Sequence, residues 1–132
     1  MGITPTMPPG KILLVDDDPL ILRLGRELLR QLGFRVAIAA DAPQALAAFQ
    51  RHKGADLVIL DYHLPTMTGY RLFQNLKALD AGVRVLLATG FISHRDEARL
   101  RESGVRGIIY KPFRLAELQG KIEAILDIPP GS

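Results

Sequence analysis

The most regular feature of the chain is a series of short apolar runs separated by segments with helical periodicity. The runs cover about residues 11–15, 35–39, 56–60, 83–88 and 106–110. Apolar runs of this length, bounded by polar or turn residues, are typical of strands that are buried on both faces of a parallel sheet. The pattern therefore predicts five parallel strands, each preceded or followed by a helix.

The segments between the runs carry the start and stop signals of helices. Asp18 and Pro19 form an N-cap followed by a proline in the first turn, and Gly33 marks the end of that helix. Helices are expected at about residues 19–32, 42–52, 69–79, 93–103 and 114–126. Strands that alternate with helices in this way predict an α/β fold, a doubly wound parallel sheet of five strands with five helices.

The order of the strands follows from where the polar residues lie. The run at 11–15 is followed by the longest acidic cluster of the chain, so it is expected at the centre of the sheet, next to the run at 56–60. The flavodoxin-like order 2-1-3-4-5 satisfies this requirement. It also puts a binding site at the switch point between the first and third strands.

Four of the runs end in polar residues that form one chemical set. Asp16 and Asp17 follow the first run, Asp61 the third, Thr89 the fourth and Lys111 the fifth. The carboxyl ends of parallel strands meet at one edge of the sheet, so we expect these side chains to converge there. Carboxylates, a hydroxyl and an ammonium suit a divalent cation and a phosphoryl group. Asp18, by contrast, is better explained as a helix cap than as a ligand.

Asp61 is the expected nucleophile of this set. It ends a fully apolar strand and precedes a loop that contains Pro65. A carboxylate can accept a phosphoryl group and form an aspartyl phosphate. Asp16 and Asp17 can hold Mg²⁺, and because clustered carboxylates repel one another, a cation is needed to keep them all ionised at neutral pH.

Composition narrows the function classes further. The 132 residues, 48% of them hydrophobic, fit one globular domain, and the absence of cysteine excludes disulfides, thiol catalysis and zinc–thiolate sites. The net charge of +3 comes from interspersed charges and does not make a nucleic-acid footprint. No apolar stretch approaches the roughly 20 residues that span a bilayer. A cytoplasmic domain without membrane or nucleic-acid contacts is expected.

With these motifs the chain resembles the receiver domain of bacterial two-component response regulators, including the receivers of hybrid sensor histidine kinases. The resemblance implies a receiver domain at residues 11–127, a flexible leader at 1–10 and a flexible tail at 128–132. The matching motifs are Ile12 to Pro19, Asp56 to Asp61 with Leu64-Pro65 and Thr68-Gly69, Leu86 to Gly90, and Lys111-Pro112-Phe113.

The resemblance implies a role for each residue of the set. Asp61 would accept a phosphoryl group from a phosphohistidine on a sensor histidine kinase or a histidine phosphotransfer protein, which would switch partner binding. The Mg²⁺ ligands would be Asp16, Asp17, Asp61 and the main-chain carbonyl of His63. Thr89 and Lys111 would bind the phosphoryl oxygens, and the Lys111–Pro112 bond would be cis. Such a domain is no turnover enzyme, although it catalyses its own phosphorylation and dephosphorylation. It is compatible with a homodimer that depends on phosphorylation.

The chain departs from the receiver pattern at one position. Receivers usually carry an aromatic residue three positions before the lysine, coupled to the hydroxyl residue, and here that position is Ile108. Tyr110 is expected on a different face from that position. Phe91 either covers the site or takes a role related to the missing aromatic. His63 either tunes dephosphorylation or is an exposed loop histidine.

The first helix contains two rows of apolar residues. One row is expected in the core, and the other, Leu22 and Leu29, lies about a quarter turn away beside arginines. This leucine pair is either a docking site for a phosphotransfer helix pair or a helix shoulder covered by its neighbours. The expected core row consists of Ile21, Leu24, Leu28 and Leu32.

Two other functions are compatible with parts of the sequence. Asp16 and Asp18 also resemble the first motif of Mg²⁺-dependent phosphohydrolases of the haloacid-dehalogenase type, with Asp16 as the nucleophile. That interpretation requires a further acidic pair after a later strand, none follows Lys111, and Asp61 would have no role. A flavodoxin-like binding protein would need a phosphate-cradling loop after the first strand, which the sequence lacks.

Overall fold

A computed structural model of the chain describes residues 10–128. The expected flexible leader at 1–10 and tail at 128–132 lie outside these residues, except for Gly10 and Ile128, and remain predictions. Within the described part no helix is long and apolar enough to cross a bilayer.

The sheet has five parallel strands in the order β2-β1-β3-β4-β5, as predicted. The first two strands have the predicted bounds, whereas the other three begin one or two residues later than expected. The shift is small because the apolar runs define the buried centre of each strand better than its ends. The strands are β1 (Lys11–Val15), β2 (Arg35–Ala39), β3 (Leu57–Asp61), β4 (Val85–Thr89) and β5 (Gly107–Tyr110).

Four of the five helices begin at a polar side-chain cap, and the last one has none. The side chain of Asp18 accepts a hydrogen bond from the Leu20 amide at 2.9 Å, so its role as a cap is confirmed. Asp41 caps the next helix through the Gln44 amide in the same way. The helices are α1 (Pro19–Gln31), α2 (Ala42–Arg51), α3 (Gly69–Leu79), α4 (His94–Glu102) and α5 (Leu115–Leu126).

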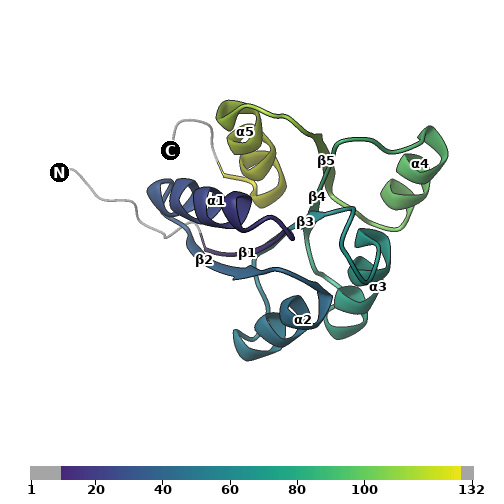
Figure 1. The fold of residues 1–132 in the computed structure, drawn as a ribbon, viewed down its shortest axis with the longest axis horizontal. Coiled ribbons are helices and arrows are strands. Elements are labelled where there is room, and N and C mark those ends of the chain that lie inside the picture. Colours follow the sequence, from purple (N-terminus) through teal and green to yellow (C-terminus); the bar gives the residue numbers. More distant parts are fainter. Residues whose placement is uncertain (1–9, 129–132) are drawn as a thin grey trace.

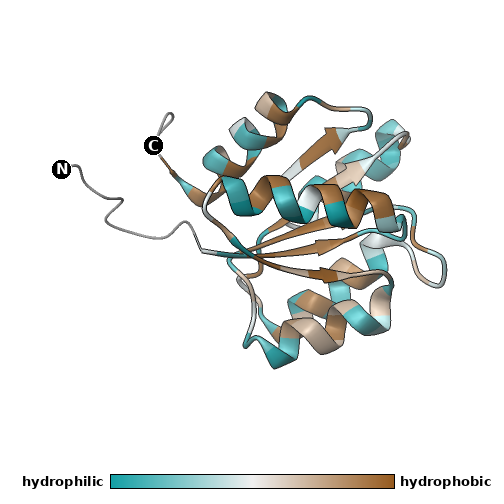
Figure 2. Cartoon of the chain, turned by 60° about the vertical axis from the view of Figure 1, so that its left-hand side comes forward, coloured by the Kyte–Doolittle hydropathy of each residue, from teal (hydrophilic) through white to brown (hydrophobic). Residues whose placement is uncertain are grey.

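The sheet is the middle of three layers. Helices α1 and α5 cover one face, and α2, α3 and α4 cover the other (Figure 1). The apolar strands run between the two layers of helices, which turn polar residues outwards (Figure 2). Burial of the strands on both faces explains why they appear in the sequence as continuous apolar runs.

The expected orientation of α1 is wrong. Leu22 and Leu29 face the sheet, and Leu29 is 1% exposed. Ile21 and Leu24 point outwards, and Leu24 is 53% exposed. The pair considered for docking is therefore part of the core. Of the expected core row, Ile21 and Leu24 are on the surface, Leu28 is half-buried, and Leu32 packs against the core.

Gly25 explains this orientation. A Cβ at position 25 would lie 2.7 Å from Cδ2 of Leu14 in β1, so the helix packs closely against the strand at this point. Gly25 lies three residues after Leu22 and four before Leu29, on the same face of the helix. The row that contains the glycine approaches the sheet closest and is buried.

Candidate functional site

The register of the strands brings their polar ends to one edge of the sheet. Val15 pairs with Leu60, so Asp16 follows its strand beside Asp61. Asp61 in turn pairs with Ala88, the residue before Thr89. The convergence that the sequence predicts is therefore a consequence of the parallel register.

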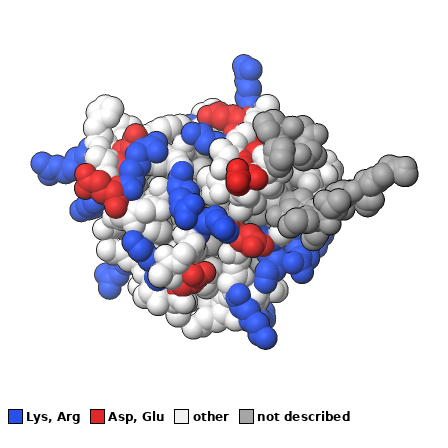
Figure 3. All heavy atoms as spheres, turned by 180° about the vertical axis from the view of Figure 1, so that it is seen from behind, with Lys and Arg blue, Asp and Glu red and all other residues white. Residues whose placement is uncertain are grey.

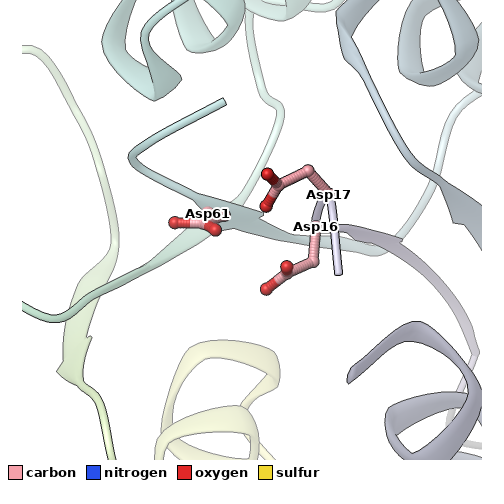
Figure 4. Close-up of side chains that lie close together, drawn as sticks. All are labelled: Asp16, Asp17 and Asp61. Atoms are coloured by element: carbon pink, nitrogen blue, oxygen red, sulfur yellow. The ribbon is translucent and has the colours of Figure 1, made fainter. Parts of the chain in front are cut away.

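The acidic residues form a compact cluster at this edge. One carboxylate oxygen from each of Asp16, Asp17 and Asp61 lies within 4.8 Å of the others (Figure 4). Asp16 and Asp61 are buried and Asp17 is exposed. Oxygen ligands at this spacing, open to solvent on one side, could bind a hard divalent cation.

Lys111 joins the two buried carboxylates. Its Nζ donates to Oδ2 of Asp16 at 2.9 Å and to Oδ2 of Asp61 at 3.3 Å. Burial opposes the charge of the ammonium, but the hydrogen bonds and charges of the two carboxylates outweigh it and raise the pKa of Lys111. The lysine therefore stays protonated beside the acidic cluster. The Lys111–Pro112 peptide bond is cis, as the resemblance implies.

Asp61 is held in a partly desolvated position. Burial raises the pKa of its carboxyl above the ordinary value, and the nearby Asp16 acts in the same direction. The His63 amide, which donates to Oδ1 of Asp61 at 3.1 Å, and the Lys111 ammonium both act to lower the pKa. A buried carboxylate beside a second one is a site where an added cation relieves repulsion.

Thr89 is fully buried at the end of β4 and hydrogen-bonds to the following loop. Its hydroxyl donates to the Phe91 carbonyl at 2.8 Å and accepts from the Phe91 amide at 3.2 Å. Phe91 is 75% exposed, so its ring is not packed into the core. Whether it covers the site stays a prediction.

The position that usually carries an aromatic residue is filled by aliphatic packing. Ile108 is buried in the core layer that includes Leu100 of α4. The expectation that Tyr110 lies on a different face is wrong. Residues two apart in a strand share a face, and the Tyr110 hydroxyl reaches Glu97 of α4.

His63 lies on the exposed loop after β3. Its Nε2 is 3.4 Å from the Phe91 carbonyl oxygen, and its ring meets the Tyr62 ring edge to face at 4.9 Å between centroids. The imidazole therefore connects the loops after β3 and β4. Its effect on dephosphorylation stays a prediction.

The exposed apolar surface of α1 is formed by other residues than the leucine pair that the sequence analysis considered. We call it the α1 patch; it consists of Leu20, Ile21 and Leu24, which are the exposed large apolar residues of the helix. The patch begins three residues after the cluster residue Asp17. The mid-helix glycine, Gly25, is the sequence signal that distinguishes the buried row from this one.

The haloacid-dehalogenase alternative has no support in the structure. Asp18, the second carboxylate of that motif, is occupied as the cap of α1. Asp61, which that mechanism leaves unused, lies in the cluster with Asp16. The comparisons with known proteins point elsewhere.

A model of the response regulator receiver domain family matches residues 12–123. The DNA-binding response regulator MtrA of Mycolicibacterium smegmatis is 38% identical over 116 residues, which cover 88% of this chain and 50% of that protein. A CheY-like receiver domain protein from Methanospirillum hungatei has a TM-score of 0.83 at 32% identity and covers 89% of this chain and 93% of its own. The response regulator TrrA from Thermotoga maritima, in complex with Mg²⁺-BeF, has a TM-score of 0.76 at 28% identity, with 87% of this chain and 97% of that chain covered.

The chain spans about half the length of the curated relatives that it matches. The family match nevertheless includes all five strands except Lys11 of β1, and it reaches residue 123 in the last helix. The fold, the strand order and the sequence match all agree. The chain belongs to the response regulator receiver domains of two-component signal transduction.

Proposed function

We propose that this receiver domain accepts a phosphoryl group on Asp61. The observation that carries the proposal is the position of Lys111 Nζ, within hydrogen-bond distance of both Asp16 and Asp61. An ammonium held beside the acceptor oxygen can neutralise the charge of an incoming phosphoryl group. Asp16 makes the same kinds of contact, through Lys111 and the Asp18 amide, so the choice of Asp61 as the acceptor rests on the match to the receiver family.

The donor in this proposal is a phosphohistidine of a sensor histidine kinase or a histidine phosphotransfer protein. A carboxylate oxygen of Asp61 forms a bond to phosphorus while the phosphorus–nitrogen bond breaks. The imidazole leaves with the electron pair of that bond and takes up a proton. Little covalent chemistry is asked of the protein, so positioning and charge neutralisation are the main contributions.

Mg²⁺ is the cation that fits the cluster. Asp16, Asp17, Asp61 and the main-chain carbonyl of His63 would hold it, since Mg²⁺ binds oxygen ligands and keeps part of its water. When bound, it supplies positive charge near the phosphoryl oxygens. The spacing of the three carboxylates and the Mg²⁺-BeF complex of the related TrrA support this assignment.

Thr89 and Lys111 complete the phosphoryl site. Lys111 contributes its ammonium, and Thr89 contributes a hydroxyl that must first leave the Phe91 carbonyl. The domain is a signalling module, and slow hydrolysis of its own aspartyl phosphate would reset it. A cytoplasmic location and an output carried by another domain or partner, as the DNA-binding relatives suggest, belong to the same proposal.

The proposal is tested with acetyl phosphate and with beryllofluoride, which imitates a phosphoryl group on an aspartate. We expect Mg²⁺-dependent NMR shifts around Asp61, Thr89 and Lys111 in the wild type and none in Asp61→Asn. Labelling by acetyl phosphate should be lost in the same variant. Labelling that persists in Asp61→Asn and disappears in Asp16→Asn would instead favour the hydrolase mechanism.

We further propose that the α1 patch contacts the phosphodonor protein. The patch lies on the helix that follows the cluster, and it is apolar, exposed and bordered by Arg23. Contiguous exposed apolar side chains often mark protein contacts. A donor that reaches Asp61 must also approach the beginning of α1, because Asp16 and Asp17 lead directly into it.

This surface is tested by the double variant Leu20→Glu/Leu24→Glu. Transfer from the donor protein should fall at least tenfold, while labelling by acetyl phosphate stays at the wild-type level. Leu79→Glu serves as the control, since Leu79 is an exposed leucine at the end of α3. An equal loss with both phosphodonors would reject the patch as a docking site.

A further inference from the structure

Helix α4 is the helix with the least apolar anchoring. Leu100 is its one buried residue, whereas each of the other helices buries two or more. Elements with few buried apolar contacts open or shift at low free-energy cost. The position of α4 must therefore depend on polar contacts to a larger degree than that of its neighbours.

Two tyrosine hydroxyls provide such contacts at the first turn of α4. The Tyr62 hydroxyl donates to Oδ2 of Asp96 at 3.5 Å, and the Tyr110 hydroxyl donates to Oε1 of Glu97. Tyr62 follows β3 and Tyr110 ends β5, so the two tyrosines reach α4 from the strands on either side of β4. The first turn is thus tied to the sheet at two separate points.

Both contacts shift the acid–base properties of the tyrosines. Burial and the Asp96 charge raise the pKa of Tyr62. The hydrogen bond to Glu97 raises the pKa of Tyr110, with a smaller effect of burial. Each hydroxyl therefore stays protonated and remains a donor.

Each of these tyrosines is the chain neighbour of a site residue. Tyr62 follows Asp61, and Tyr110 precedes Lys111. The third connection is the loop that leads into α4, since the Thr89 hydroxyl donates to the Phe91 carbonyl, two residues before the N-cap Ser93.

The Thr89 connection must change when a phosphoryl group is bound. A hydroxyl has one hydrogen, so Thr89 cannot donate fully to the Phe91 carbonyl and to a phosphoryl oxygen at the same time. Phosphorylation therefore removes a hydrogen bond from the loop that positions the start of α4. Tyr70 and Lys77 contact the far end of α4 at Ser103, so the two tyrosine contacts are the ones that remain at its first turn.

We infer that Tyr62 and Tyr110 form a clamp on α4 that couples this helix to the state of the phosphorylation site. The inference rests on the proposed function of Asp61. The clamp takes the place of a buried aromatic residue at position 108, where the chain has isoleucine. Tyrosine hydroxyls on the surface of α4, rather than a side chain turning into the core, would then carry the signal.

The clamp is tested by hydrogen–deuterium exchange of the full chain, with Mg²⁺ and beryllofluoride as the activating probe. The double variant Tyr62→Phe/Tyr110→Phe removes only the two hydroxyls. Without the probe, its amides in residues 94–102 should exchange about threefold faster than those of the wild type, because two hydrogen bonds to the first turn are lost. Activation should speed exchange of α4 in the wild type and have a much smaller effect in the variant.

Tyr70→Phe is the matched control. The Tyr70 hydroxyl lies 3.4 Å from Oγ of Ser103, at the opposite end of α4, so its removal should leave the first turn unchanged. Wild-type exchange of α4 in the double variant, or equal acceleration in Tyr70→Phe, would overturn the clamp. Failure of the wild type to bind beryllofluoride would overturn the assignment of Asp61 instead, and this result is independent of exchange in the unactivated protein.

Discussion

At the scale of single residues, the site concentrates negative charge where water is scarce. Asp16 and Asp61 are both buried, and the Lys111 ammonium compensates them only in part. Burying a charged group costs free energy unless partners restore what water supplied. The repulsion between the two carboxylates is therefore only partly compensated. A cation, alone or together with a phosphoryl group, would reduce it further.

The raised pKa of Asp61 has a consequence for stability. A carboxyl whose pKa is higher in the folded state binds more protons when folded, so the free energy of unfolding falls as the pH rises from the ordinary aspartate pKa of 3.8 through the folded value. Asp61→Asn removes this penalty. In a buffer free of divalent cations the variant should melt a few degrees above the wild type at pH 7, by circular dichroism. Asp17→Asn, at an exposed position, should change the melting temperature little, and a lower melting temperature of Asp61→Asn would contradict the prediction.

Gly69 is required because the backbone at the end of β3, around Asp61 and Tyr62, lies very close to it. A Cβ at this position would lie 2.7 Å from Cα of Tyr62 and 2.8 Å from the carbonyl oxygen of Asp61. Because the backbone cannot move aside cheaply, Gly69→Ala should lower the free energy of unfolding by about 1–3 kcal/mol in urea denaturation. Gly120→Ala in α5 meets nothing within 4 Å and should instead raise it, by up to about 1 kcal/mol. Equal effects of both substitutions would reject this account.

At the scale of elements, α1 shows how a helix with two apolar rows is oriented. Both rows are leucine-rich, and packing against β1 selects the row that contains the glycine. Ile21 and Leu24 of the other row, together with Leu20, form the α1 patch. In α5, Leu118 and Ile122 are buried, whereas Leu115 at the helix start is exposed.

The orientation of α1 can be tested by replacing two leucines of this helix with alanine. Leu29→Ala should lower the free energy of unfolding by about 2–5 kcal/mol, because it opens a cavity in the core. Leu24→Ala, at an exposed position on the same helix, should change it by less than about 0.5 kcal/mol. Urea denaturation of the two variants measures both changes. A larger loss of stability in Leu24→Ala than in Leu29→Ala would favour the orientation expected from the sequence.

At the scale of the whole molecule, the charges are distributed over the surface. Figure 3 shows Lys and Arg interspersed with Asp and Glu on one face, without a patch of a single sign. On this face the mixed charges are typical of a solvated surface. That the domain does not itself bind nucleic acid stays a prediction. Among the described residues, Asp16, Asp17 and Asp61 form a compact acidic cluster at the sheet edge.

Binding of a cation at this cluster should stabilise the entire fold. The cluster joins the ends of β1 and β3, which adopt their relative position only in the folded state. Mg²⁺ should therefore raise the melting temperature of the wild type, by an amount equivalent to about 2.7 kcal/mol at a hundredfold excess over the dissociation constant. Asp17→Asn should weaken this dependence on Mg²⁺. Identical Mg²⁺ titrations of the two proteins would show that Asp17 is no ligand.

The sequence by itself determined the layer architecture, the strand order and the edge at which Asp16, Asp61, Thr89 and Lys111 meet. Buried parallel strands need continuous apolar runs, and the residue that ends each run must lie at the carboxyl edge, so both properties are local and visible. The structure alone decided which row of α1 is buried and which residues hold α4. Periodicity defines a face of a helix but not the neighbour that covers it. The contacts of Tyr62 and Tyr110 with Asp96 and Glu97 likewise join segments far apart in the chain, which meet only after the sheet has formed.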